Sequence, residues 1–368
     1  METNPALGVT IFALGGLAGA VFYLPFKKVK NWAWESYWLV YAVFGLVIVP
    51  WALALSTAPN LLAVLRGTPS KELAWCFACG AMWGVGGLTW GLMIRYLGVG
   101  LGLAIGCGLC SATGTLVPPI LEGHLEKLYG SPAANVSLLG VAVSILGIVL
   151  VGMAGISKEN ELPEEAKKKA VAEYNFKLGI LVALFSGITS SGMSFGLQGG
   201  ANIEKLATSL APATSSTWRG MPVLVVVLAG GFAVNFLWCL FLNAKNRTFG
   251  DYAKAGTPLT LNIVFAGLAG AIWCSQFICF KTGEPAMGER AYIGWAVLMA
   301  SAILFSTLLG ILLGEWKGTS GRTRVLLSLG LLLLLTSAAI AAYGGSVKEK
   351  PADEKSAAVA SIAPRCFA

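Results

Sequence analysis

The chain has 368 residues, of which 56% are hydrophobic and only 12% are charged, and its formal net charge is +8. Soluble domains carry about a quarter charged residues, so too few charges remain here to cover the surface of a water-soluble fold. The composition also excludes a disordered chain and a disulfide-rich secreted scaffold, and the 46 glycines follow no collagen-like period.

Ten apolar runs of about 20 residues, the length that crosses the hydrocarbon core as a helix, follow one another along the chain. Because irregular backbone cannot face lipid, we expect these runs to be helices packed as a bundle. The predicted fold is an all-α integral membrane protein with ten transmembrane helices. The predicted spans are 7–26, 37–56, 73–96, 100–121, 137–156, 178–198, 217–242, 259–280, 291–313 and 324–343.

The polar gaps divide the chain into two halves. The longest and most charged gap, "KENELPEEAKKKAVAEYNFK", covers residues 158–177 and is predicted to be a central loop between two five-helix repeats at 1–157 and 178–343. Residues 344–368 are polar and rich in small residues, so this tail is predicted to be disordered.

Short sequence matches relate the two halves. "GAMW" (Gly80 to Trp83) in the third span matches "GAIW" (Gly270 to Trp273) in the eighth. The openings of spans 1 and 6, "LGVTIFALGG" and "LGILVALFSG", match as well, as do the ends of spans 4 and 9, "TLVPPIL" and "TLLGILL". Five spans per half is an odd number, so the repeats are predicted to be inverted in the membrane, which is typical of transporters that bind substrate near the midplane.

Positive charge indicates the orientation. The loops after odd-numbered spans hold more Lys and Arg than the loops after even-numbered spans, which favours a cytoplasmic position for the odd loops and an outside position for both termini. The basic residues lie between apolar runs without a nucleic-acid-binding module, so no nucleic-acid partner is predicted. Residues 1–6 carry no positive charge, so the first run is expected to be a span rather than a cleavable signal.

Aromatic and amide side chains on spans 3 and 8 form the best candidate binding site. Trp83 and Trp90 are seven residues apart on one face of span 3, and Trp273 and Gln276 share a face of span 8. Sugars stack their C–H faces on aromatic rings, and a few polar groups beside such rings make a small-molecule site. Tryptophans that face lipid or the helix core are the alternative. We predict that the sugar site comprises Trp83, Thr89, Trp90, Gln198, Trp273 and Gln276, with Tyr23 and Trp34 near its mouth.

Acidic residues are the expected carriers of a coupled proton. No Asp or Glu falls in the middle of a predicted span, and the candidates are Glu35 and Glu289, which lie next to predicted spans. The alternative for both is an ordinary carboxylate at the membrane surface. Two C-x-x-C pairs, Cys76/Cys79 and Cys107/Cys110, open different spans and have no histidine beside them, so we expect no metal and no cofactor.

Four segments resemble the L-rhamnose–proton symporter family of the drug/metabolite transporter superfamily. They are "FYLPFKKVKNWAWESYW", "GAMWGVGGLTWGLMIRYLG", "SGMSFGLQ" and "LGEWKG", and the resemblance runs from about Leu7 to Tyr343. It implies ten helices in two five-helix repeats and proton-driven uptake of a 6-deoxyhexose across the bacterial inner membrane. "GGLTW" (Gly86 to Trp90) and "FKTGEPAMGER" depart from the family pattern, so the choice of sugar stays open.

Three functions are compatible with this pattern. The first is a secondary transporter that takes up L-rhamnose or a related monosaccharide with protons by alternating access. The second is a superfamily exporter of amino acids or other small metabolites. The third is a membrane sensor that binds sugar without moving it. An enzyme is not expected, because no catalytic constellation of side chains is visible. The expected partners are a small sugar, protons and membrane lipid, and the oligomeric state is undetermined.

Overall fold

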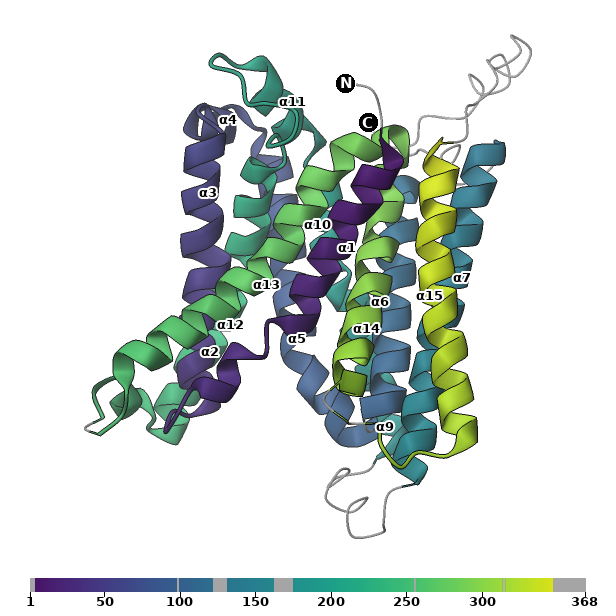
Figure 1. Cartoon of the computed structure of the whole chain (residues 1–368). Coiled ribbons are helices and arrows are strands. Elements are labelled where there is room, and N and C mark those ends of the chain that lie inside the picture. The colour runs from purple at the N-terminus through teal and green to yellow at the C-terminus, as the bar shows by residue number, and fades with distance from the viewer. Residues whose placement is uncertain are drawn as a thin grey trace.

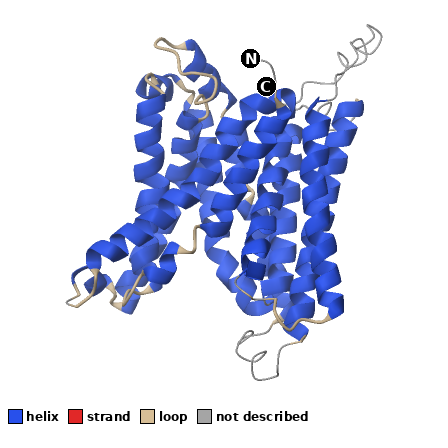
Figure 2. Ribbon diagram, viewed as in Figure 1, coloured by secondary structure: helices blue, strands red, loops and turns tan. Residues whose placement is uncertain are grey.

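A computed structural model describes residues 4–97, 99–121, 131–161, 175–254, 256–312, 314 and 316–346. All regular secondary structure in these ranges is helical (Figure 2). The middle of the predicted central loop, residues 162–174, and most of the predicted tail, residues 347–368, lie outside the described ranges. The fold class is therefore the predicted one, an all-α protein.

The first half of the chain begins with α1 and ends with α7, which runs into the predicted central loop as far as Asn160. Between α2 and α3, the turns at Phe44–Ile48 widen to a π-helix just before Pro50, which has no N–H to donate to a regular α-helical ladder. The helices are α1 (Pro5–Val21), η1 (Pro25–Lys28), α2 (Trp34–Val43), η2 (Phe44–Ile48), α3 (Val49–Thr57), α4 (Leu61–Gly67), α5 (Ser70–Leu97), α6 (Val99–Leu121) and α7 (Pro132–Asn160).

The second half begins with a broken helix, in which α9 ends at Ser190 and α10 starts at Gly192. Its helices are α9 (Phe176–Ser190), α10 (Gly192–Gln198), α11 (Ala201–Ser209), α12 (Met221–Asn246), η4 (Phe249–Ala253), α13 (Leu259–Met287), η5 (Gly288–Ile293), α14 (Gly294–Leu312) and α15 (Gly321–Ser346). The start of α1 and the end of α15 lie at the same end of the molecule (Figure 1).

Within the described residues, nine helical stretches are long and apolar enough to cross a membrane. The remaining predicted span corresponds to α6, whose stretch Ile105–Leu121 is apolar but shorter. The protein is thus a multi-pass membrane protein, and the arrangement of ten helices as two inverted repeats stays a prediction.

Helix packing agrees with the sequence matches between the halves. Helix α1 packs on α13 and α14, whereas α9 packs on α5 and α6, and α7 runs along α15. Gly8 on α1 lies against Met287, where an added Cβ would be 2.7 Å from the sulfur. The matched Gly179 on α9 lies against Leu97, where a Cβ would be 2.5 Å from Cδ2. The alignment that pairs Trp83 with Trp273 also pairs Leu97 with Met287, so the two glycine contacts lie at equivalent positions of the two halves.

A second pair of contacts is matched between the two halves in the same way. Gly16 on α1 packs tightly against Ser301 on α14, and the matched Gly187 on α9 packs against Leu109 on α6. The alignment of "TLVPPIL" with "TLLGILL" pairs Leu109 with Ser301. Such matched contacts are what a twofold relation between the halves predicts.

The two G-A-x-W segments lie at close helix crossings. A Cβ on Gly80 of α5 would collide with the Val227 carbonyl oxygen of α12, and a Cβ on Gly270 of α13 would lie 2.5 Å from the Tyr41 carbonyl oxygen of α2. Small residues allow helix backbones in a membrane to approach this closely. Each crossing fixes the tryptophan that lies one turn further along its helix.

Candidate functional site

Trp83 and Trp273 meet at the centre of the molecule. Trp83 is the fourteenth of 28 residues in α5, and Trp273 is the fifteenth of 29 residues in α13. Their ring centroids are 5.0 Å apart with the planes tilted by 30°, and Trp273 is only 7% exposed. One ring comes from each half of the chain, so the pair spans the interface between the halves.

Further aromatic rings connect this pair to the protein surface. Trp273 contacts Tyr41 edge-on at 5.9 Å, Tyr41 contacts Trp38 at 4.6 Å, and Trp38 stacks on Trp34 at 4.9 Å. Tyr23 also contacts Trp38, at 6.4 Å. Tyr23 and Trp34 are 56% and 38% exposed, so the column runs from the tryptophan pair to an accessible end. The structure thus brings four of the predicted residues into one aromatic column.

Thr89 and Trp90 have different partners, on α9. The Thr89 hydroxyl hydrogen-bonds the Ser186 hydroxyl at 2.7 Å, and the Trp90 indole N–H donates to the Ser190 hydroxyl at 2.7 Å. These bonds hold α5 against α9 near the break that precedes α10. In this conformation the two residues line the α5–α9 contact rather than the aromatic column.

The two predicted glutamines lie in separate places. The Gln276 amide nitrogen donates to the Trp273 carbonyl at 3.0 Å, and its side-chain oxygen faces Gly19 of α1. Gln198, the last residue of α10, donates to the Gly114 carbonyl of α6 at 3.2 Å and to the Ser194 hydroxyl at 2.5 Å. Gln276 therefore lies one turn from the tryptophan pair, whereas Gln198 lines a pocket beside another polar group.

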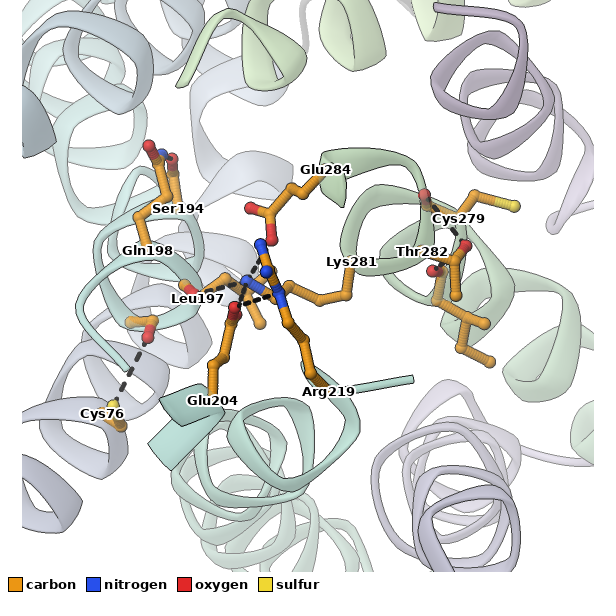
Figure 3. A network of polar contacts seen from close by, with 12 residues as sticks. Cys76, Ser194, Leu197, Gln198, Glu204, Arg219, Cys279, Lys281, Thr282 and Glu284 are labelled. Atoms are coloured by element: carbon orange, nitrogen blue, oxygen red, sulfur yellow. Dashed lines mark hydrogen bonds and ion pairs between the residues drawn. The ribbon is translucent and has the colours of Figure 1, made fainter. Parts of the chain in front are cut away.

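That polar group is a network of four charged side chains, which we call the charge cluster: Glu204, Arg219, Lys281 and Glu284. The Lys281 ammonium pairs with Glu204 at 2.5 Å and with Glu284, and it donates to the Leu197 carbonyl at 3.0 Å. Arg219 Nε lies 2.9 Å from the other oxygen of Glu204. Figure 3 shows side chains from α11, from the turn before α12 and from α13 converging on the Lys281 ammonium.

A pocket of about 190 Å³ opens beside the charge cluster. Its wall includes all four cluster residues together with Gln198 and Tyr292. The pocket thus joins a residue predicted for the sugar site to a set of charges that the sequence interpretation missed.

The eighth helix is longer than the predicted span 259–280, and the added turns carry two charged residues. Helix α13 continues past residue 280 to Met287, so Lys281 and Glu284 belong to a candidate membrane span. The signal in the sequence is the spacing of three residues between Lys281 and Glu284, which places opposite charges on one face of a helix. The sequence gives no such signal for Glu204 and Arg219, because their ion-pair partners are distant in sequence.

Glu35, a predicted proton carrier, is buried near the start of α2 and serves as a hydrogen-bond acceptor. Its carboxylate accepts from the Asn246 amide and from the Thr248 hydroxyl, each at 2.9 Å. Beside it, Asp251 accepts from the Ala33 backbone N–H at 2.7 Å and so caps the first turn of α2. The side chain of Glu289, the other predicted carrier, lies outside the described part of the structure.

The cysteines of the two C-x-x-C pairs are free thiols, on α5 and on α6. Among the described residues, no group of three or more His, Cys, Asp or Glu side chains is close enough to hold a metal ion.

Comparison with known proteins adds to this geometry. The family model described as "L-rhamnose-proton symport protein" matches residues 1–347. The L-rhamnose-proton symporter of Yersinia pestis is 32% identical over 348 residues, which cover 94% of this chain and 99% of the relative. The protein of the same name from Pectobacterium atrosepticum is 33% identical over 350 residues, covering 94% of this chain and all of the relative. The chain therefore belongs to the L-rhamnose–proton symporter family, a family of membrane transporters.

Proposed function

We propose that this protein takes up L-rhamnose or a closely related 6-deoxyhexose together with protons, across the bacterial inner membrane. The observation that carries this proposal is the match to rhamnose symporters over nearly the whole of both chains. The comparisons give no support to the two alternatives, a metabolite exporter and a non-transporting sugar sensor.

The tryptophan pair supports a sugar site at the centre. A pyranose ring presents flat C–H faces, and the indole rings of Trp83 and Trp273 offer matching surfaces from both halves of the chain. Here the two rings contact each other, so the sugar has to separate them or bind along their edges. The side-chain oxygen of Gln276, one turn from Trp273, would accept hydrogen bonds from sugar hydroxyls, while its amide nitrogen donates to the Trp273 carbonyl.

Alternating access supplies the movement. In transporters built from inverted repeats, one repeat rocks against the other around a central site. The matched contacts of α1 and α9 support such a relation between residues 1–157 and 178–343. The distribution of Lys and Arg supports an orientation with both termini outside.

Uptake of labelled sugars into vesicles with an imposed proton gradient tests the proposal. We expect accumulation of L-rhamnose that stops when a protonophore collapses the gradient. L-Mannose, which differs from L-rhamnose by a hydroxyl on C6, is the matched competitor and should inhibit weakly. Binding of rhamnose without its accumulation would favour the sensor, and export of amino acids without rhamnose uptake would favour the exporter.

A further inference from the structure

Charged side chains inside a membrane span are costly and for that reason usually functional. Lys281 and Glu284 are 2% and 6% exposed, and both lie in the candidate span Leu259–Met287. Apolar residues could complete this end of α13 at lower cost in free energy. The helix packing alone therefore does not account for the charge cluster.

We propose that Glu284 is the residue that binds the coupled proton, and that Lys281, which is itself paired with Glu204, holds it in place. This inference rests on the proposed function, because it assigns the proton site of that symport. It differs from the sequence-based candidates, since the contacts of Glu35 with described residues are to an amide and a hydroxyl and include no cation.

The contacts distinguish Glu284 from Glu204. Glu204 pairs with both Lys281 and Arg219, whereas Glu284 has one ion pair among the described contacts, to Lys281. A proton on Glu284 removes that pair but leaves the chain from Lys281 through Glu204 to Arg219 intact. Of the two carboxylates, Glu284 therefore loses less when it becomes neutral.

The charges of the cluster balance when Glu284 is ionised. Two cations then face two carboxylates, and the cluster is neutral overall. A proton that binds a Glu284 oxygen gives a neutral carboxylic acid and leaves the cluster with one positive charge. Because an uncompensated charge is costly at a buried site, the protonated cluster favours a conformation in which the buried Lys281 gains water.

The pocket beside the charge cluster gives the proton a route to Glu284, and Gln198, a residue predicted for the sugar site, lines the same pocket. The ionisable groups that line it beside Glu284 are Glu204 from α11, Arg219 from the turn before α12, Lys281 from α13 and Tyr292 from η5. Arg290 also lies on η5, and α1, which packs along α13, has no charged residue between Pro5 and Val21. Gln198 lies in the same wall and bonds α6 through the Gly114 carbonyl.

Protonation of Glu284 would remove the ion pair that Lys281 makes within α13 and leave its contacts with other helices in place. Lys281 joins α13 to the end of α10 through the Leu197 carbonyl and to α11 through Glu204. Loss of the Glu284 charge frees the ammonium from its own helix. Release of the proton on the other side of the membrane restores the ion pair and closes the cycle.

The variant Glu284→Gln, purified and reconstituted in liposomes, tests the assignment. Two activities are measured: exchange of labelled for unlabelled L-rhamnose, which needs no net proton movement, and accumulation of L-rhamnose driven by a proton gradient. We expect Glu284→Gln to keep exchange and to lose both accumulation and rhamnose-dependent proton entry.

The matched control is Glu72→Gln at the same end of the molecule. Glu72 accepts hydrogen bonds from the backbone and side chain of Asn202 and stands outside the charge cluster. This control should retain coupling. Coupled accumulation by Glu284→Gln, or uncoupling by Glu35→Gln in place of Glu284→Gln, would overturn the inference while the proposed function stands. Absence of rhamnose-dependent proton entry in the unmodified protein would instead contradict the proposed function.

A measurement on the unmodified protein covers the case in which Glu284→Gln does not insert. Dicyclohexylcarbodiimide adds the O–H of a protonated carboxylic acid across its C=N bond and labels acids in apolar surroundings. Mass spectrometry of the labelled protein should find the adduct on Glu284, in decreasing amount as the pH rises. Labelling of other carboxylates with Glu284 unmodified would contradict the proposal.

Discussion

Trp83 and Trp273 have equivalent positions in the two halves of the sequence, so their contact joins matching points of the two halves. Each lies at the midpoint of a membrane helix, next to a glycine crossing, and each supplies one ring of the central pair. The sequence predicted both residues, because the G-A-x-W match singled them out. It could not predict that the rings touch, since contact depends on the tilt of α5 and α13.

Replacing Trp83 or Trp273 by Ala should abolish L-rhamnose uptake while the protein still inserts in the membrane. The change removes one stacking surface for the sugar and leaves the helix backbones unaltered. Uptake and membrane-inserted protein are measured on the same vesicles. Trp238→Ala, at a 44% exposed position on α12, is the control and should transport normally. Undiminished uptake by both central variants would remove stacking from the account.

The charge cluster shows why part of the site could not be predicted. Hydropathy ended the eighth span at residue 280, because Lys281 and Glu284 lower the average over any window that includes them. Once these charges compensate each other, the helix continues to Met287. Their partners, Glu204 and Arg219, come from segments that no local pattern connects to α13.

At the scale of the elements, glycine crossings decide how closely the helices approach. Gly80 of α5 packs against α12, and Gly230 of α12 packs against α5. An added Cβ on Gly80 would collide with the Val227 carbonyl oxygen, and one on Gly230 would collide with the Phe77 carbonyl oxygen. The sequence could not identify which glycines occupy a crossing, because Gly91 lies on the same helix as Gly80 and has nothing within 4 Å of its Cβ position.

Gly80→Ala should therefore destabilise the protein by about 1–3 kcal/mol, the usual cost of overpacking a tight contact. Gly91→Ala, on the same helix, should leave stability unchanged or raise it slightly, because alanine favours the helix. The thermal midpoint of both variants in detergent measures the difference. Equal midpoints for the two variants would show that α5 and α12 do not cross at Gly80.

Glu161 connects the end of α7 to the start of α15. Its carboxylate accepts from the Ser320 backbone N–H at 2.7 Å, from the Ser320 hydroxyl at 2.6 Å and from the Thr323 hydroxyl. These hydrogen bonds, from Ser320 first and Thr323 next, lower the pKa of Glu161 from 4.5 to about 2. A carboxylate at the N-terminus of a helix is also favoured by the helix dipole.

The lowered pKa of Glu161 determines how the stability of the folded protein changes with pH. A carboxylate whose pKa is lower in the folded state stabilises that state fully above pH 4.5, and the stabilisation is lost as the pH falls from 4.5 towards 2. Glu161→Gln should therefore lower the thermal midpoint at pH 7, and the difference from the unmodified protein should be smaller at pH 3. A difference that grows on acidification would contradict this role.

For the whole molecule, the apolar runs were sufficient to predict an all-α membrane protein, because each span must satisfy its own backbone hydrogen bonds. Hydropathy could not predict the interruptions inside the spans. The π-helix at Phe44–Ile48 and the break between α9 and α10 are local responses to Pro50 and to the packing of Gly192 on α5. Both interruptions lie in helices that contact the central helices α5 or α13.

Symport requires the sugar and the proton to cross the membrane together. The most direct test loads proteoliposomes with a pH-sensitive dye, imposes no gradient of pH or voltage, and adds L-rhamnose outside. We predict acidification of the lumen that requires rhamnose, saturates with its concentration and disappears in Glu284→Gln. Entry of labelled rhamnose without a change in lumenal pH, or no entry of either, would contradict symport.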